Sequence, residues 1–153
     1  MCEGRGRNLA SRITGGQAHD TKQLVPLLDE VAVPRLIPGV RCRKRLDHLC
    51  ADKAYGSRAN RAALRHRGVA HAIPEREDVI KARARRGSAG GRPPKLDKER
   101  YKTRNQVERL MNRRKQFRAV ATRFDKLGVR YRATVYVADI FIWLRAKPDQ
   151  SPR

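Results

Sequence analysis

The chain has 153 residues, with 37 Lys or Arg against 15 Asp or Glu, so its formal net charge is +22. This length suits one domain with a modest core, and so positive a chain favours a polyanionic partner such as nucleic acid. No apolar run is long enough to span a bilayer and no signal-peptide pattern opens the chain, so we expect a cytoplasmic protein without a membrane partner.

The first third of the sequence predicts short elements separated by turns. Residues 8–13 suit a short strand, and Gly15 and Gly16 mark a turn. Asp20 is placed to cap a helix over residues 21–31, in which leucine and valine recur at helical spacing. Proline residues then predict a loop over residues 34–38.

A strand, a helix and a second strand are expected next. Residues 46–51 read as a buried strand that ends just before Asp52, and residues 69–73 read as another strand. Between them lies a predicted helix over residues 58–67, with Ser57 as its N-cap and Gly68 at its end. This order within about 30 residues is typical of a βαβ unit, which makes the two strands parallel.

The composition changes after residue 80. Residues 81–118 hold 15 Lys or Arg and 3 acids, more than half of the net charge. Gly and Pro make residues 85–95 a predicted mobile loop, whereas residues 98–118, which contain neither, predict one long helix opened by Asp97. Residues 133–144 are expected to form a buried helix, with a strand as the alternative, and a disordered tail should follow from Lys147.

The predicted long helix carries four polar residues on one side. Tyr101, Arg104, Glu108 and Lys115 are separated by three, four and seven residues, which places them within about 60° around an ideal helix. Glu108 is the one carboxylate of this ridge, suited to a divalent metal among cations that suit phosphate. The simpler alternative is a surface ion pair between Arg104 and Glu108.

Asp52 is a second candidate acid. It follows the carboxyl end of a predicted parallel strand, where α/β sheets place ligands. The simpler alternative is an aspartate in the turn before a helix. Two metal ions held by shared carboxylates are the usual device for in-line attack on a phosphodiester, so the two acids together suit metal-dependent DNA chemistry.

These motifs resemble a known family. The spacing Tyr101-x2-Arg104-x3-Glu108-x6-Lys115 is similar to the Y-R-E-K signature of DDE-type insertion-sequence transposases, and residues 51–60 resemble the block around that family's second aspartate. Residues 14–17, 86–94 and 121–126 resemble the branch usually numbered the fifth insertion-sequence family. The resemblance runs from about residue 2 to residue 145.

The resemblance implies an α/β catalytic domain over residues 1–145, an RNase H-like mixed sheet flanked by helices, followed by a tail over residues 146–153. It implies metal-dependent DNA cleavage and strand transfer, with Mg²⁺ or Mn²⁺ held by Asp52 and Glu108. Cations and one phenol would bind the element ends and the target DNA: Tyr101, Arg104, Lys115, Arg85, Arg86, Arg92, Arg113 and Arg114. A bacterial, nucleoid-associated protein that acts as a homo-oligomer is expected.

The family's first aspartate has no counterpart here, because Glu3 and Asp20 fall in the wrong blocks. We therefore expect an N-terminally truncated fold whose first strands are missing, inactive as an isolated chain. An N-terminal half encoded in an overlapping frame would complete it, and a decayed element is the alternative.

Two other hypotheses stay open. Cys42, His48 and Cys50 are close enough in sequence to suggest zinc, but a fourth ligand at the usual spacing is absent. A non-catalytic basic DNA-binding protein is the main rival to the enzyme. It would use residues 81–118 as a phosphate clamp, and Arg92 before its proline faintly resembles a minor-groove hook.

Overall fold

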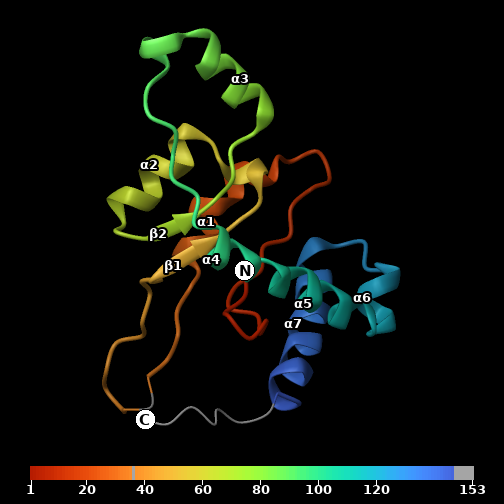
Figure 1. Ribbon diagram of the computed structural model, residues 1–153. Helices are drawn as coiled ribbons and strands as arrows, with labels where there is room; N and C mark the ends of the chain where they lie inside the picture. The colour runs from red at the N-terminus through yellow and green to blue at the C-terminus, as the bar shows by residue number, and fades with distance from the viewer. Residues whose placement is uncertain (36, 147–153) are drawn as a thin grey trace. The chain divides into compact units, whose positions relative to one another are not determined.

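The computed structural model describes residues 1–35 and 37–146, and it divides into two compact units. Met1–Gly16 and Gln106–Arg153 form the first unit, and Gln17–Asn105 forms the second. Both are drawn in Figure 1. The mixed α/β class that the sequence predicts is confirmed. The tail predicted from Lys147 lies outside the described residues, whereas Ala146 is described.

A βαβ unit forms the centre of the second unit, as predicted. Strand β1 (His48–Cys50) pairs in parallel with β2 (Ala70–Ala72), with Leu49 opposite His71, and helix α2 (Arg58–His66) connects them. The start and stop residues of α2 act as expected. The Ser57 hydroxyl accepts a hydrogen bond from the Asn60 N–H at 3.2 Å, and Gly68 adopts a φ of +64° that favours glycine.

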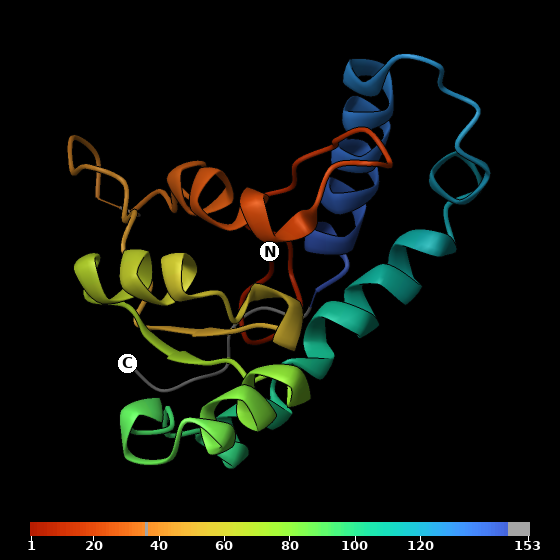
Figure 2. The same ribbon diagram turned by 90° about the horizontal axis from the view of Figure 1, so that it is seen from above.

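The two faces of this small sheet are covered by different helices. Leu49 is buried in a core that also contains Leu64 of α2, whereas the next residue, Cys50, contacts α4 (Lys98–Lys102). Successive side chains of a strand point to opposite faces, so α2 and α4 lie on opposite sides of the strands (Figure 2). The other buried apolar residues of this unit are Leu24, Leu28, Val31, Val69, Ala72 and Ile73.

The helix expected over residues 21–31 is shorter and starts differently. A 3-10 turn, η1 (Asp20–Gln23), leads directly into α1 (Leu24–Asp29). Asp20 lies inside that turn, the cap position is His19, and no side chain makes a capping hydrogen bond there. The capping role predicted for Asp20 is therefore wrong. Pro26 fits the first turn of α1, because the amide that it lacks would have had no partner within the helix.

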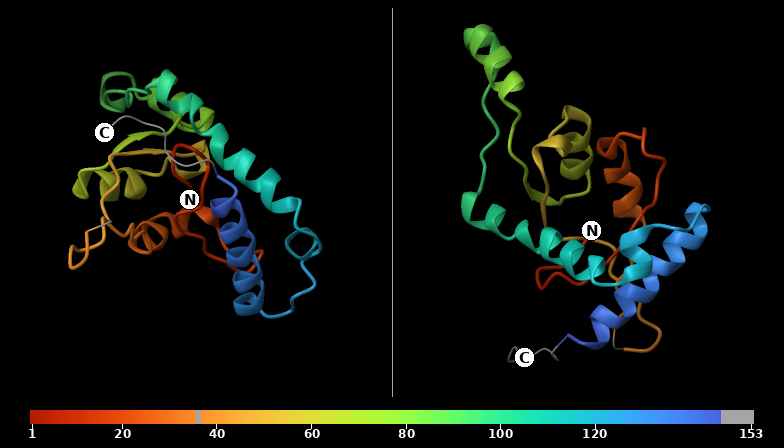
Figure 3. Two further views of the ribbon diagram at one scale, coloured as in Figure 1. Left: turned by 90° about the horizontal axis from the view of Figure 1, so that it is seen from below. Right: turned by 90° about the vertical axis from the view of Figure 1, so that its right-hand side faces the viewer.

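The segment after β2 contains a helix that the sequence analysis did not predict, and the predicted loop over residues 85–95 contains a short 3-10 turn. Helix α3 (Glu77–Arg85) and the 3-10 turn η3 (Gly87–Gly90) form a green hairpin away from the two strands (Figure 3, right). Both guanidinium nitrogens of Arg83 donate to the Glu75 carboxylate at 2.6 Å, which ties α3 to the segment before it. Glycine favours turns because it adopts a positive φ at no steric cost, and Gly87, at the start of η3, has a φ of +52°.

The first unit packs three helices against the N-terminal segment. They are α5 (Asn105–Lys115), whose first residue falls in the second unit, α6 (Arg118–Thr122) and α7 (Gly128–Leu144). Val120 of α6 packs with Val135 and Ala138 of α7. The Tyr131 hydroxyl donates to the Val120 carbonyl at 3.0 Å, which fixes the two helices together.

Two predictions for this unit differ from the structure. Residues 8–13 form no strand, since Asn8 makes only an isolated antiparallel bridge with Cys2. The helix predicted over residues 133–144 is present but is only half-buried. Val137 and Leu144 are 53% and 76% exposed, because α7 is apolar on all sides and this unit covers one of them.

Candidate functional site

Asp52 lies where the sequence placed it, just after the carboxyl end of β1. Its carboxylate caps the 3-10 turn η2 (Lys53–Tyr55), accepting a hydrogen bond from the Lys53 N–H at 2.6 Å. The side chain is exposed to solvent. The capping bond orients the carboxylate, and the exposed position leaves it accessible to a ligand at the end of the parallel strands.

The turn after Asp52 is held by two side chains from α2. Asn60, which is 6% exposed, donates to the carbonyls of Tyr55 and Thr21 at 3.2 and 3.1 Å. Arg61 donates to the Gly56 carbonyl at 3.2 Å and to the Ile73 carbonyl at 2.7 Å. We did not predict these two positioning residues. A buried asparagine on a short helix needs hydrogen-bond partners, and that requirement is the signal that points to Asn60.

The pKa of the Tyr55 hydroxyl reflects the negative charge around this turn. Burial raises the pKa of its hydroxyl, and the negative charges of Asp20 and Asp52 raise the pKa further. The two carboxylates therefore act on the same phenol. The turn and η1 are linked directly, because the Thr21 hydroxyl donates to the Ala54 carbonyl at 2.8 Å. Asp20 thus belongs to the surroundings of Asp52.

The polar ridge predicted on one long helix does not form as a continuous helix. α4 ends at Lys102, Thr103 and Arg104 form a turn, and α5 begins at Asn105. Asp97 opens α4 as predicted, accepting a hydrogen bond from the Arg100 N–H at 3.0 Å. The Thr103 hydroxyl instead bonds back to the Arg100 carbonyl at 2.7 Å, a side-chain contact that competes with helix continuation.

The four ridge residues separate into two pairs. Tyr101 and Arg104 are half-buried in the second unit, with the guanidinium carbon 5.7 Å from the centre of the phenol ring. Glu108 and Lys115 are exposed on α5 in the first unit, seven residues apart and therefore on one face of that helix. Asp52 lies in the second unit, whereas Glu108 lies in the first unit.

α4 is attached to the strand that leads to Asp52. The Cys50 thiol donates to the Arg100 carbonyl at 3.1 Å and lies 3.4 Å from the Thr103 hydroxyl. Tyr101 therefore belongs to a helix that contacts β1 two residues before Asp52. This contact holds the helix that carries the DNA-binding candidate Tyr101 against the strand that ends before the catalytic candidate Asp52.

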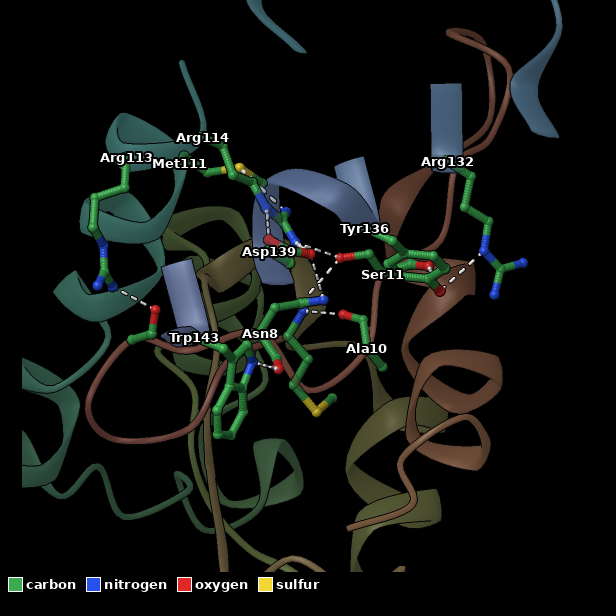
Figure 4. A network of polar contacts seen from close by, with 12 residues as sticks. Asn8, Ala10, Ser11, Met111, Arg113, Arg114, Arg132, Tyr136, Asp139 and Trp143 are labelled. Carbon is green, nitrogen blue, oxygen red and sulfur yellow. Dashed lines mark hydrogen bonds and ion pairs between the residues drawn. The ribbon is translucent and has the colours of Figure 1, made fainter. Parts of the chain in front are cut away.

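Two of the predicted DNA-binding arginines have structural partners instead. Arg114 is 6% exposed, and its guanidinium donates to both oxygens of Asp139 at 2.7 Å and to the Ser11 hydroxyl at 2.8 Å (Figure 4). Arg113 is half-buried and donates to the Gly6 carbonyl. In this structure the charge of Arg114 is satisfied by a buried carboxylate, so the DNA contact predicted for Arg114 has no exposed cation to carry it. The sequence does contain one indication of this pair: Asp139 is a lone acid in an apolar segment, and a buried acid needs a cationic partner.

The remaining predicted DNA contacts are open to solvent. Arg85 is the last residue of α3, Arg86 follows it, and Arg92 lies in the segment after η3. All three are exposed. The hairpin of α3 and η3 and the segment after it thus present exposed cations, which suits contact with a polyanion.

The zinc hypothesis gains no support. His48 and Cys50 do lie together, with the thiol sulfur 3.5 Å from the imidazole Nδ1, but Cys42 is exposed on another segment. Burial lowers the pKa of His48, and the positive charge of Arg100 lowers it further. Within residues 1–35 and 37–146, no group of three or more His, Cys, Asp and Glu side chains is arranged to hold a metal.

Comparison with known proteins decides the family. A family model described as the transposase DDE domain matches residues 1–134. The chain belongs to this family. Insertion-sequence relatives agree: a transposase of element IS402 from Burkholderia cepacia is 34% identical over 76 residues, and one of element IS6501 from Brucella ovis is 32% identical over 102 residues.

The two relatives are covered to different extents. The match to the IS402 protein includes 50% of this chain and 36% of that protein, so the chain spans about a third of its length. The match to the IS6501 protein includes 67% of this chain and 71% of that protein. No solved structure gives a significant match. Among the described helices of this family member, none has the length and apolar character needed to cross a bilayer.

Proposed function

We propose that this chain is part of the catalytic domain of an insertion-sequence transposase, with an RNase H-like fold, that cuts and joins DNA. The observation that carries the proposal is the position of Asp52, exposed and oriented at the carboxyl end of a parallel strand within a βαβ unit. Ligands bind at this end of parallel sheets. Membership of the transposase DDE family supports the same reaction.

We propose Asp52 and Glu108 as ligands of Mg²⁺ or Mn²⁺. Both side chains are exposed carboxylates, and hard divalent cations prefer oxygen ligands, so the residues present fit such an ion. Ions held by these carboxylates would supply activation of the attacking hydroxyl and stabilisation of the leaving oxygen. The turn held by Asn60 and Arg61 keeps Asp52 in place, which lowers the entropic cost of binding the ion.

The other residues would position DNA. Tyr101, Arg104 and Lys115 would hold phosphates, and exposed Arg85, Arg86 and Arg92 would hold the flanking DNA of the element ends or the target. Phosphate contacts fix the register of a substrate and carry no sequence information. We therefore expect binding with little sequence preference from these residues, and a steep fall of affinity with salt.

The complete active form would contain more than this chain. Two-metal chemistry needs acids from several elements, and the described residues bring no three potential ligands together. We propose that an N-terminal half, encoded in an overlapping frame, supplies a further acid, and that the active species is a homo-oligomer. Incubated alone with element-end DNA and Mg²⁺ or Mn²⁺, the chain should leave the DNA intact.

Paired titrations test the assignment of the acids. In the chain supplemented with its N-terminal half, Asp52→Asn or Glu108→Gln should lower Mn²⁺ affinity at least tenfold and abolish strand transfer, while DNA affinity is kept or improved. Glu99→Gln is the matched control, because Glu99 is an exposed acid whose partner is Lys102 on the same helix. Strand transfer that survives in Glu108→Gln would remove Glu108 from the site.

The net charge of +22 favours one other candidate, a non-catalytic DNA-binding remnant of a decayed element. That protein would bind DNA with the same salt dependence, since both depend on cations that meet phosphate. The two candidates differ in the effect of metal. A remnant would show no Mn²⁺ binding that depends on Asp52 and Glu108, even with an N-terminal half present.

A further inference from the structure

Residues 33–35 and 37–45 belong to a projecting arm, hereafter the basic arm, in the second unit. Val33 and Arg43 form an antiparallel bridge, each donating its N–H to the carbonyl of the other at 2.9 and 2.7 Å. The chain between them runs away from β1 and back as the orange loop in Figure 1. Leu36, within this loop, lies outside the described residues.

The tip of the basic arm is a defined turn. The Val40 N–H donates to the Ile37 carbonyl at 3.3 Å, and Gly39 has a φ of +79°. Proline at the second position and a left-handed glycine at the third position are typical of a type II turn. The turn is therefore set by local chemistry.

Apolar side chains flank that turn on both sides. Ile37 is 66% exposed and Val40 is 41% exposed, with Pro38 between them also exposed. Burying the exposed part of these two aliphatic side chains in a partner would remove apolar surface from water, which is favourable. The tip is thus an apolar wedge that the second unit leaves in water.

The stem behind the tip is strongly basic. Residues 33–46 contain five cations and no acid. All five are exposed: Arg35, Arg41, Arg43, Lys44 and Arg45. Arg43 pairs with Asp47, and Arg45 donates to the Gly68 carbonyl at 3.1 Å, so these two also brace the base of the arm. An apolar tip on a cationic stem matches a groove that has bases at its floor and phosphates along its rims.

We propose that the basic arm enters the minor groove of duplex DNA, with Arg41 and Lys44 on phosphates and Ile37 and Val40 against a base step. The proposal relies on the proposed function only for the partner being DNA. The arm extends at most about 14 Å beyond the bridge, because four residues separate the bridge from the tip, so it is long enough for a groove roughly 7.5 Å deep. Its two paired segments are about 4.8 Å apart, which is narrower than the groove width of roughly 6 Å. Apolar wedges inserted there partly unstack a base step and bend the duplex.

A duplex carrying 2-aminopurine at a flexible step and a fluorophore pair at its ends tests this proposal on the full chain. Wild-type protein should raise the 2-aminopurine emission and shorten the end-to-end distance. The tip variant Ile37→Ser/Val40→Ser should lose both signals and about tenfold in affinity, because the gain from burial is partly offset by unstacking. Val79→Ser/Ile80→Ser, which removes two comparably exposed aliphatic side chains from α3, should keep both signals.

The stem variant Arg41→Ala/Lys44→Ala gives an independent measurement. Each phosphate contact contributes about 0.9 to the slope of log affinity against log salt. Losing two contacts should therefore reduce the fall in affinity between 50 and 200 mM salt by about twelvefold. Far-UV circular dichroism of each variant should match that of the wild type, because the substituted side chains are exposed.

The outcomes separate this proposal from the proposed function. Unchanged emission, bend and salt slope in both variants, with DNA still bound, would overturn the basic arm and leave the transposase assignment intact. A chain that binds no duplex at low salt would overturn both. Emission and bend that vanish in Arg85→Ala/Arg86→Ala and persist in the tip variant would assign the distortion to α3 instead.

Discussion

The buried ion pair between Arg114 and Asp139 should dominate the stability of the first unit. Arg114→Ala removes three charge-assisted hydrogen bonds, two of them to the Asp139 carboxylate. The Asp139 side chain is 6% exposed and keeps the hydrogen bond that the Asn8 amide donates at 2.8 Å. Removing one partner of a buried pair typically costs about 3–5 kcal/mol. Small domains have about 5–15 kcal/mol in total, so this variant should lose a large share of its stability.

Urea unfolding at neutral pH, followed by tryptophan fluorescence, measures this loss. Trp143 is a suitable probe, because its indole N–H donates to the Asn8 carbonyl at 3.0 Å within the same network. Arg109→Ala, an exposed arginine on the same helix, should change the free energy of unfolding by less than about 0.5 kcal/mol. The pair of variants separates burial of the charge from loss of a cation.

A double variant isolates the cause of the loss. Arg114→Met/Asp139→Leu removes both charges and should recover most of the stability, because an apolar pair avoids the desolvation cost of an ion pair. Its DNA affinity and salt slope should equal those of the wild type. A loss below about 1 kcal/mol in Arg114→Ala, together with a reduced salt slope, would refute the reasoning and return Arg114 to the DNA-binding surface.

Two further predictions concern local features. Gly6→Ala should lower the free energy of unfolding by about 2 kcal/mol, because Gly6 has a φ of +75° and an added Cβ would lie 2.5 Å from an Arg113 nitrogen. Gly4→Ala is the control, because the space around Gly4 is open, and it should be nearly neutral in the same urea assay. The hydrogen bond from Arg83 lowers the pKa of Glu75 below its ordinary 4.5, so this carboxylate stabilises the fold above that pH and the contribution is lost as pH falls through its folded pKa. Glu75→Gln should therefore destabilise at pH 7 and converge with the wild type in acid, and an equal loss at both pH values would contradict the pairing.

Local chemistry explains which parts of the fold the sequence predicts well. The Ser57 cap, the Gly68 stop and the parallel order of β1 and β2 all depend on residues close together in sequence. The position of Asp52 follows from the same unit, because a residue after a parallel strand must lie at the carboxyl end of the sheet. These elements needed no information from distant segments.

The features that the sequence does not reveal involve residues whose partners are far away in sequence. Arg114 looks like any other cation of a basic helix, and its partners Asp139 and Ser11 are 25 and 103 residues away. The break at Thr103 depends on its own hydroxyl and on the attachment of α4 to Cys50, 53 residues earlier. Helical periodicity records which face a side chain occupies, and it contains no information about such long-range partners.

The attachment of α4 to β1 through the Cys50 thiol makes this residue a chemical reporter. A thiol hydrogen-bonded to the Arg100 carbonyl reacts with an alkylating reagent only when that contact opens, whereas Cys42 is exposed and gives the labelling rate of an open thiol in the absence of DNA. The ratio of the two labelling rates therefore measures how often α4 leaves the sheet. Protection of Cys50 that increases when DNA is added would show that the substrate locks Tyr101 onto the strand that ends before Asp52.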